Sequence, residues 1–313
     1  EPGSHAGAAA PVVAPAGGGR ERLAWATTAT ALALIAIALA IIMVLRTPKL
    51  PQPMRLSAEI GADAILYPST GNGPSAILSP DGTRLALVAL GSDQKRRIYV
   101  RALDQLQATV LSGTENALDH FFSPDGQWIG FFADGKLKKI SVQGGAAVTL
   151  CDAPQTRGGS WGDDGAIVFS PNQYVALSKV FSGGGTPQLL TTLDKQAGEG
   201  TQRWPQVLPG SKAVLFTSDI LAPFEDAEIV VYSMASGQRK TVLRGGFYAR
   251  YLPSGHLVYM HEGTLFAVPF DIEKLEVTGQ PAPIIEDVAT NNSGGAQFSF
   301  SDTGNLAYVA GGG

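Results

Sequence analysis

Hydrophobic and polar positions divide the chain into four parts. Residues 1–22 carry almost no large apolar side chains and read as a flexible linker rich in Ala, Pro and Gly. Residues 23–45, LAWATTATALALIAIALAIIMVL, contain no charged side chain. At about 1.5 Å per residue this segment reaches roughly 34 Å, which exceeds a bilayer core of about 30 Å. The pattern predicts one transmembrane helix over residues 23–45, followed by a proline-rich spacer over residues 46–54.

A buried core helix and a signal peptide are the alternatives for this apolar segment. Core helices rarely run this long without a charge, and the apolar regions of signal peptides span about 7–15 residues before a small-residue cleavage site. Thr27, Thr28 and Thr30 can donate to carbonyls of the preceding helical turn, so they do not weaken the prediction. Basic residues stand at both ends of the segment, so charge alone does not orient it in a membrane.

From residue 55 onward, short β-branched and aromatic runs alternate with Gly, Pro and Asp. A turn motif recurs every 39–49 residues. An apolar strand follows each turn, and in five of the six repeats a second and a third strand follow it. The six turns read SPDG at 79–82, SPDG at 123–126, GDDG at 162–165, LPGS at 208–211, LPSG at 252–255 and SDTG at 301–304.

This period predicts a β-propeller. A meander of three or four strands cannot bury both its faces, so units of about 40–45 residues pack radially as blades. We expect each turn to open the inner strand of a blade. Five blades can be counted, and a sixth has only its first strand, at residues 304–309. Residues 55–60, RLSAEI, are the candidate strand that closes this last blade. The predicted fold is an all-β propeller of about six blades over residues 55–313, truncated at its C-terminal end.

Composition narrows the function classes. The formal charge of −4 argues against non-specific nucleic-acid binding, which needs a clustered basic face. Cys151 is the single cysteine, so neither a disulfide framework nor a CxxC metal knuckle is possible. We therefore expect no nucleic-acid partner and no cofactor.

One short motif resembles a hydrolase site. GGSWG at residues 158–162 matches the Gly-x-Ser-x-Gly elbow, which needs a strand-to-helix turn to expose its serine. Here Ser160 is followed by a turn and then a strand, and Trp161 falls in the same repeat column as Phe122. The match is therefore best explained by the blade pattern, and no catalytic residue is assigned.

Aspartates recur in the turns, and a calcium site is one interpretation of them. Calcium needs about six to eight oxygen ligands at one point, whereas equivalent turns of different blades are spread around a ring. Turn capping is the favoured role, and no metal site is assigned. His256 and His261 are five residues apart along a strand, which puts their side chains on opposite faces. The turn aspartates are Asp81, Asp125, Asp163, Asp164 and Asp302.

The turn followed by an apolar strand resembles the WD-like repeats of TolB-type propellers. The runs GFFADGKLKKI, RGGSWGDDG and QRWPQVLPG are more similar still to the extracytoplasmic region of bacterial receptor-type serine/threonine kinases. In that group a kinase domain, one membrane span and a TolB-like propeller follow in order. The resemblance covers about residues 20–313 and implies a single-pass inner-membrane protein with its propeller in the periplasm or outside the cell. The turns GDDG, LPGS and SDTG depart from the family pattern.

The kinase chemistry itself is missing from this chain. No glycine-rich loop follows a strand, and neither His-Arg-Asp nor Asp-Phe-Gly occurs. The predicted function is therefore a membrane-anchored sensor or binding module of such a kinase. The propeller of a prolyl-oligopeptidase-like peptidase and a TolB-like envelope scaffold are the alternatives.

The predicted function implies two kinds of partner. Residues 23–45 would contact the lipid bilayer, and a protein, peptide or small molecule would bind one face of the propeller. Arginine and tryptophan are good interface anchors, although both tryptophans can equally pack between blades. The candidate ligand-binding residues, all near blade entries, are Arg157, Trp161, Arg203, Trp204 and Arg250.

Overall fold

The computed structural model describes residues 19–45, 55–68, 73–219 and 223–311. The chain separates into two compact units, Glu1–Ala58 and Glu59–Gly313. Most of the predicted linker and all of the predicted spacer, residues 1–18 and 46–54, lie outside the described residues.

The first unit contains one helix, α1 (Gly19–Leu45), which includes the end of the predicted linker. Its window Leu23–Ile41 has a mean hydropathy of 2.0, and none of it is buried by protein. The Thr27 hydroxyl donates to the carbonyls of Leu23 and Ala24 at 3.1 and 2.9 Å, as the sequence predicts. The helix is long and apolar enough to anchor the chain in a membrane, a property that signal sequences share.

The second unit is built from five antiparallel sheets of four or five strands, here called blades 1 to 5, and a two-stranded closing sheet. Blade 1 contains β1 (Ala64–Leu66), β2 (Ala76–Leu78), β3 (Arg84–Gly91), β4 (Arg96–Ala102) and β5 (Thr109–Val110). Blade 2 contains β6 (Leu118–Phe122), β7 (Trp128–Ala133), β8 (Lys136–Ser141) and β9 (Val148–Asp152). Blade 3 contains β10 (Gly159–Trp161), β11 (Ala166–Phe169), β12 (Ser178–Phe181) and β13 (Gln188–Leu189).

The second half of the unit repeats this arrangement. Blade 4 contains β14 (Thr201–Val207), β15 (Ala213–Asp219), β16 (Glu228–Ser233) and β17 (Arg239–Arg244), with short 3-10 helices at Pro209–Ser211 and Phe224–Asp226. Blade 5 contains β18 (Phe247–Leu252), β19 (His256–His261), β20 (Thr264–Asp271), β21 (Glu276–Val277) and β22 (Ala282–Ile285). The closing sheet contains β23 (Phe298–Phe300) and β24 (Leu306–Tyr308).

The β-propeller prediction is confirmed, and a strand follows each of the six turns as expected. The prediction that each turn opens the innermost strand is wrong, because another strand precedes every turn. These first strands are β2, β6, β10, β14, β18 and β23. First strands of neighbouring sheets touch one another, as β10 does with β6 and with β14, so they line the centre of the ring. Each turn therefore joins the innermost strand to the second strand.

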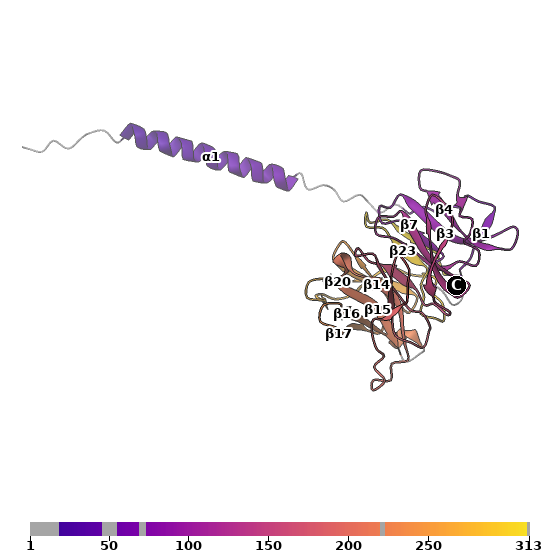
Figure 1. The fold of residues 1–313 in the computed structure, drawn as a ribbon. Coiled ribbons are helices and arrows are strands. Elements are labelled where there is room, and N and C mark those ends of the chain that lie inside the picture. The colour runs from indigo at the N-terminus through magenta and orange to yellow at the C-terminus, as the bar shows by residue number, and fades with distance from the viewer. Residues whose placement is uncertain (1–18, 46–54, 69–72, 220–222, 312–313) are drawn as a thin grey trace, which may run out of the picture. The chain divides into compact units, whose positions relative to one another are not determined.

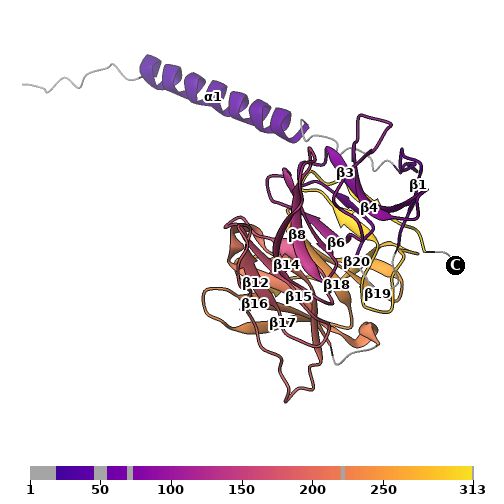
Figure 2. The same cartoon turned by 45° about the vertical axis from the view of Figure 1, so that its right-hand side comes forward.

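The ring closes between the closing sheet and blade 1. In Figures 1 and 2 the yellow C-terminal strands lie beside the purple sheet of blade 1. The Leu78 amide donates to Ser299 Oγ at 3.0 Å, and the Ser75 amide donates to Gln297 Oε1 at 2.8 Å. Only two strands of this sheet occur in the described residues, so the structure has five blades and a partial sheet, and six blades are not confirmed.

The predicted closing strand at residues 55–60 is wrong. These residues form no strand, and Ile60 instead packs against Leu87 and Tyr99 of blade 1. The Glu59 carbonyl accepts a hydrogen bond of 2.6 Å from Arg101, also in blade 1. The segment therefore leads into the first blade and does not complete the last one.

The repeated turns are capped by their own side chains. Ser123 Oγ donates to Asp125 Oδ1 at 2.5 Å and accepts from the Trp128 amide at 3.0 Å, while the Gln127 amide donates to Asp125 Oδ1 at 3.0 Å. The first turn repeats these contacts, and hydrogen bonds from Ser79 and Thr83 lower the pKa of Asp81 to about 2. The capping role predicted for these two aspartates is confirmed.

Aromatic side chains pack between the blades. Within blade 2, the rings of Phe121 and Phe132 have centroids 6.1 Å apart. The Phe132 ring also lies 6.1 Å, between centroids, from the Phe169 ring of blade 3. A Cβ on Gly159 would lie 2.6 Å from the Phe121 ring, and one on Gly130 would collide with the same ring. One glycine of blade 2 and one of blade 3 therefore make room for a phenylalanine beside the centre of the ring.

Candidate binding site in the central channel

A cavity of about 220 Å³ occupies the centre of the propeller, and residues of all six first strands line it. Pro80, Pro253 and Asp302, which belong to the turns, lie at one end of the cavity. Gly73, Asp119, Trp204 and Tyr248 lie among its lining residues at the opposite end of those strands. We call the first end the mouth and the second end the floor.

The floor is built from one repeat position, four residues before each turn. Four of the six residues there have left-handed backbones, with φ of 45° at Asp119, 89° at Gly158, 54° at Trp204 and 53° at Tyr248. Strand pairing is interrupted at this point in β6, β14 and β18, which marks a β-bulge in each. Bulky residues rarely adopt this conformation, and such strain concentrates at binding and catalytic sites. The residues at this position are Ser75, Asp119, Gly158, Trp204, Tyr248 and Gln297.

Gly73 lies on this floor and contacts several sheets. Its amide donates to Asp119 Oδ1 at 2.6 Å, and its carbonyl accepts from Gln297 Nε2 at 2.9 Å. A Cβ on Gly73 would lie 3.3 Å from the Trp204 ring and 3.6 Å from the Tyr248 hydroxyl. A segment of blade 1 therefore reaches residues of blades 2, 4 and 5 and of the closing sheet at this end of the channel.

Asp119 is the titratable group of the floor. Its side chain is buried, with the Gly158 amide and the Thr156 hydroxyl close by in addition to the Gly73 amide. Burial raises the pKa of Asp119 to about 6, against the opposing effects of the Gly73 amide and the nearby Arg157 charge. His120 follows it and is also buried, which lowers the pKa of its imidazole to about 4, so the ring is neutral at pH 7.

The five candidate residues separate into two groups. Trp161, Trp204 and Arg250 line the cavity, whereas Arg157 and Arg203 are not among its lining residues. The last two stand one residue before the left-handed residues Gly158 and Trp204. Arg203 Nη1 donates to the Ser293 carbonyl at 2.9 Å.

Arg250 is the basic side chain of the cavity wall. Its guanidinium lies 4.0 Å from the centroid of the Tyr248 ring, and Nη1 donates to the Trp204 and Ala249 carbonyls at 2.9 and 2.8 Å. No carboxylate of the described residues forms an ion pair with it. The stacking and the carbonyl contacts fix a positive charge in the wall without neutralising it.

Ser160 serves the packing of neighbouring blades. Its Oγ accepts a hydrogen bond of 2.9 Å from the Val207 amide in blade 4, and strand β11 follows its turn. His261 lies 3.4 Å from Glu225, and His256 contacts Ser254. Within the described ranges, no group of three or more His, Cys, Asp or Glu side chains is arranged to hold a metal ion.

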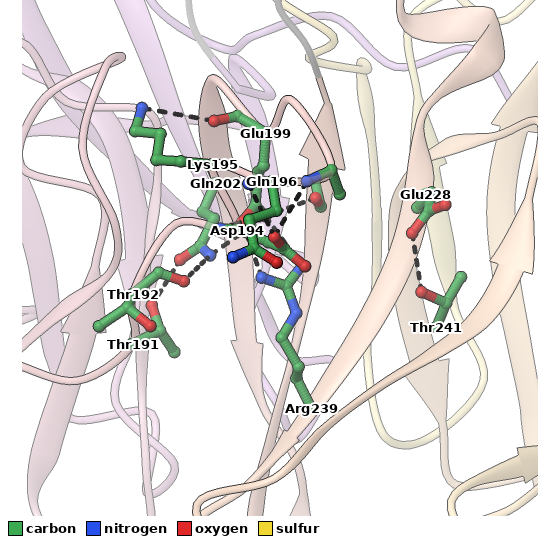
Figure 3. A network of polar contacts seen from close by, with 12 residues as sticks. Thr191, Thr192, Asp194, Lys195, Gln196, Glu199, Gln202, Glu228, Arg239 and Thr241 are labelled. Carbon is green, nitrogen blue, oxygen red and sulfur yellow. Dashed lines mark hydrogen bonds and ion pairs between the residues drawn. The ribbon is translucent and has the colours of Figure 1, made fainter.

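A second cavity, of about 410 Å³, lies beside blade 4. Figure 3 shows its central ion pair, in which buried Glu199 receives two hydrogen bonds of 2.7 and 3.0 Å from Arg239. Burial alone would raise the pKa of Glu199, but these bonds and one from Ser218 leave it lowered. The Asp194 amide also donates to Glu199 at 2.6 Å. Since this pair neutralises itself and holds the loop before β14, the cavity is a weaker candidate than the channel.

The comparisons with known proteins show the fold. No protein-family model matches the chain, and no curated protein matches it. Among solved structures it is similar to a TolB described as putative from Agrobacterium tumefaciens (TM-score 0.53, 15% identity), covering 75% of this chain and 90% of that one. It is also similar to TolB from Acinetobacter baumannii (TM-score 0.50, 13% identity), covering 71% of this chain and 55% of that one.

An oligogalacturonate lyase from Vibrio parahaemolyticus has the same fold, with a TM-score of 0.55, 14% identity and coverage of 80% of this chain and 72% of that one. At these identities the similarity establishes a β-propeller with TolB-like neighbours and carries no activity over to this chain.

Proposed function

We propose that this chain is the membrane-anchored binding and sensing part of a bacterial receptor-type serine/threonine kinase. Helix α1 anchors it in the inner membrane, and the propeller binds its ligand in the central channel outside the cytoplasm. The channel carries the proposal, because it is a cavity at the centre of the ring that an arginine and tryptophans line. The strained bulges that build its floor support the same conclusion.

The channel also offers a route for a signal. Gly73 and Pro74 line the cavity, and they belong to the segment that follows β1, the first strand after the anchor. A ligand on the floor touches this segment directly, so binding can change its position or its order. A differential contact of this kind is what allows a ligand to shift a conformational equilibrium.

Topology tests the proposal first. Alkaline phosphatase fused after residue 313 is expected to be active in cells, whereas green fluorescent protein fused there and exported through the same membrane is expected to stay dark. A bright fluorescent fusion with an inactive phosphatase fusion would contradict the proposed orientation.

The gene itself separates the alternatives. Coding sequence upstream of Glu1 is expected to specify a kinase catalytic loop with His-Arg-Asp. A Gly-x-Ser-x-Gly hydrolase domain downstream of residue 313 would instead favour the peptidase. A cleaved signal in place of α1 would favour the envelope scaffold.

A further inference from the structure

The channel cavity holds a fixed positive charge that no carboxylate of the described residues neutralises. Arg250 stacks on Tyr248 and donates to two main-chain carbonyls, so its position is set before any ligand arrives. Neutral carbonyl contacts orient a guanidinium but leave its charge unbalanced. A partly buried, oriented arginine of this kind favours the planar oxygens of a carboxylate.

The other charges around the cavity lie at its two ends. Asp119 is on the floor, where its carboxylate accepts from the Gly73 amide and faces the positive charge of Arg157. Asp302 is at the mouth, where burial and the nearby Asp163 raise its pKa. His120 is neutral at pH 7, because burial lowers its pKa to about 4. Arg250 is therefore the group of the wall that still lacks a partner of opposite charge.

Size and surface limit the rest of the ligand. A volume of about 220 Å³ is smaller than the roughly 300–1,000 Å³ of sites for drug-sized molecules. Aromatic side chains supply much of the wall, including Phe121, Trp161 and Phe300. Aromatic walls bury apolar or planar groups, and they favour edge or offset contacts with another ring.

We propose that the channel binds a small monocarboxylate with an aromatic or branched apolar body. Its carboxylate pairs with Arg250, and its body lies against Phe121, Trp161 and Phe300. This inference rests on the proposed function in using the same cavity, and it adds the chemical class of the ligand.

Three probes of similar size and different charge test the inference on the whole chain in lipid nanodiscs. They are 3-phenylpropionate, its uncharged amide 3-phenylpropanamide and the cation 3-phenylpropylamine, titrated by calorimetry. The carboxylate is expected to bind in the millimolar range or tighter, as a ligand of this size can. Its affinity is expected to exceed that of the amide about ten- to a hundredfold, the usual gain from a charge-assisted hydrogen bond.

Variants assign the effect to the arginine. Arg250→Gln is expected to reduce carboxylate affinity to that of the amide and to leave amide affinity unchanged, while Arg250→Lys recovers part of the loss. Arg244→Gln is the matched control, because this exposed arginine pairs with Glu228 outside the channel and should change nothing. If Arg250→Gln fails to fold, the order of the three probes on the wild-type chain still decides.

Equal binding of the amide and the carboxylate would overturn the inference, and so would tighter binding of the amine. Absence of binding by all three probes at millimolar concentration would overturn it as well. In each of these cases the fusion experiment still tests the proposed membrane-anchored, extracytoplasmic module separately.

Discussion

Replacing Asp119 with asparagine measures how much the ionisation of this buried carboxyl group changes the free energy of unfolding. Asparagine keeps the oxygen that accepts the Gly73 amide at 2.6 Å and removes the titrating proton. The wild-type carboxyl has a pKa of about 6 in the folded chain, against an ordinary value of 3.8. Because the folded-state pKa is the higher one, folding favours the protonated form.

The sign and size of the effect follow from linkage. The stabilising contribution of protonated Asp119 is complete below about pH 4, and it is lost as the pH rises through about 6. A difference of roughly two pKa units corresponds to about 3 kcal/mol of unfolding free energy. About half of this should be lost between pH 5 and pH 8, so wild-type stability should fall relative to the variant across that interval.

Urea denaturation of both chains from pH 3 to pH 8 provides the assay, since other titrating groups cancel in the difference between the two curves. Asparagine carries a buried NH₂ group that can shift the variant by a constant amount, so the slope with pH is the quantity of interest. A difference that stays constant within about 0.5 kcal/mol over this range would refute the assignment of a raised pKa to Asp119.

Three further substitutions test the fold around the site. Gln297→Ala removes the bonds to Ser75 and Gly73 that close the ring and should cost about 3–5 kcal/mol in urea denaturation, while exposed Gln238→Ala should cost less than about 0.5 kcal/mol. Ser123→Ala removes the cap of the second turn and should lower the unfolding free energy by about 1–2 kcal/mol; no change would show that the turn holds without it. Gly130→Ala places a methyl group against Phe121, so it should lower the unfolding free energy by about 1–3 kcal/mol and weaken probe binding. Unaltered affinity would show that Phe121 does not contact the ligand.

The repeat made most of the fold predictable from the sequence. Strands after the turns, such as β7 and β11, are continuous runs without polar side chains, because both faces of a central blade strand are buried. The innermost strands were not predicted, because their sequences lack a long regular pattern of apolar side chains. β10 has only three residues, and β14 reads TQRWPQV, with a proline and a bulge that break the alternation of side chains.

The role of Gly73 in the channel was harder to predict than the side chains that line the cavity. Trp161, Trp204 and Arg250 could be selected as candidates from their residue types, but the part played by Gly73 depends on partners more than 200 residues away, such as Gln297. Arg157 and Arg203 were placed with the other three because all five lie near blade entries, a criterion that does not reveal which side chains line the cavity. The spacing of four residues before each turn is the sequence signal that identifies the floor.

Labelling of a single cysteine in the channel wall tests the central claim most directly. Cys151 is buried, and burial raises the pKa of its thiol to about 11, so it contributes little background and can be replaced by alanine. Ser299→Cys lies in the cavity, and exposed Ser236→Cys serves as the control for topology. In intact spheroplasts, a membrane-impermeant maleimide is expected to label both positions, and 3-phenylpropionate is expected to protect only position 299. Labelling of position 299 that appears only after lysis, or that the carboxylate does not slow, would contradict an extracytoplasmic propeller with its ligand in the channel.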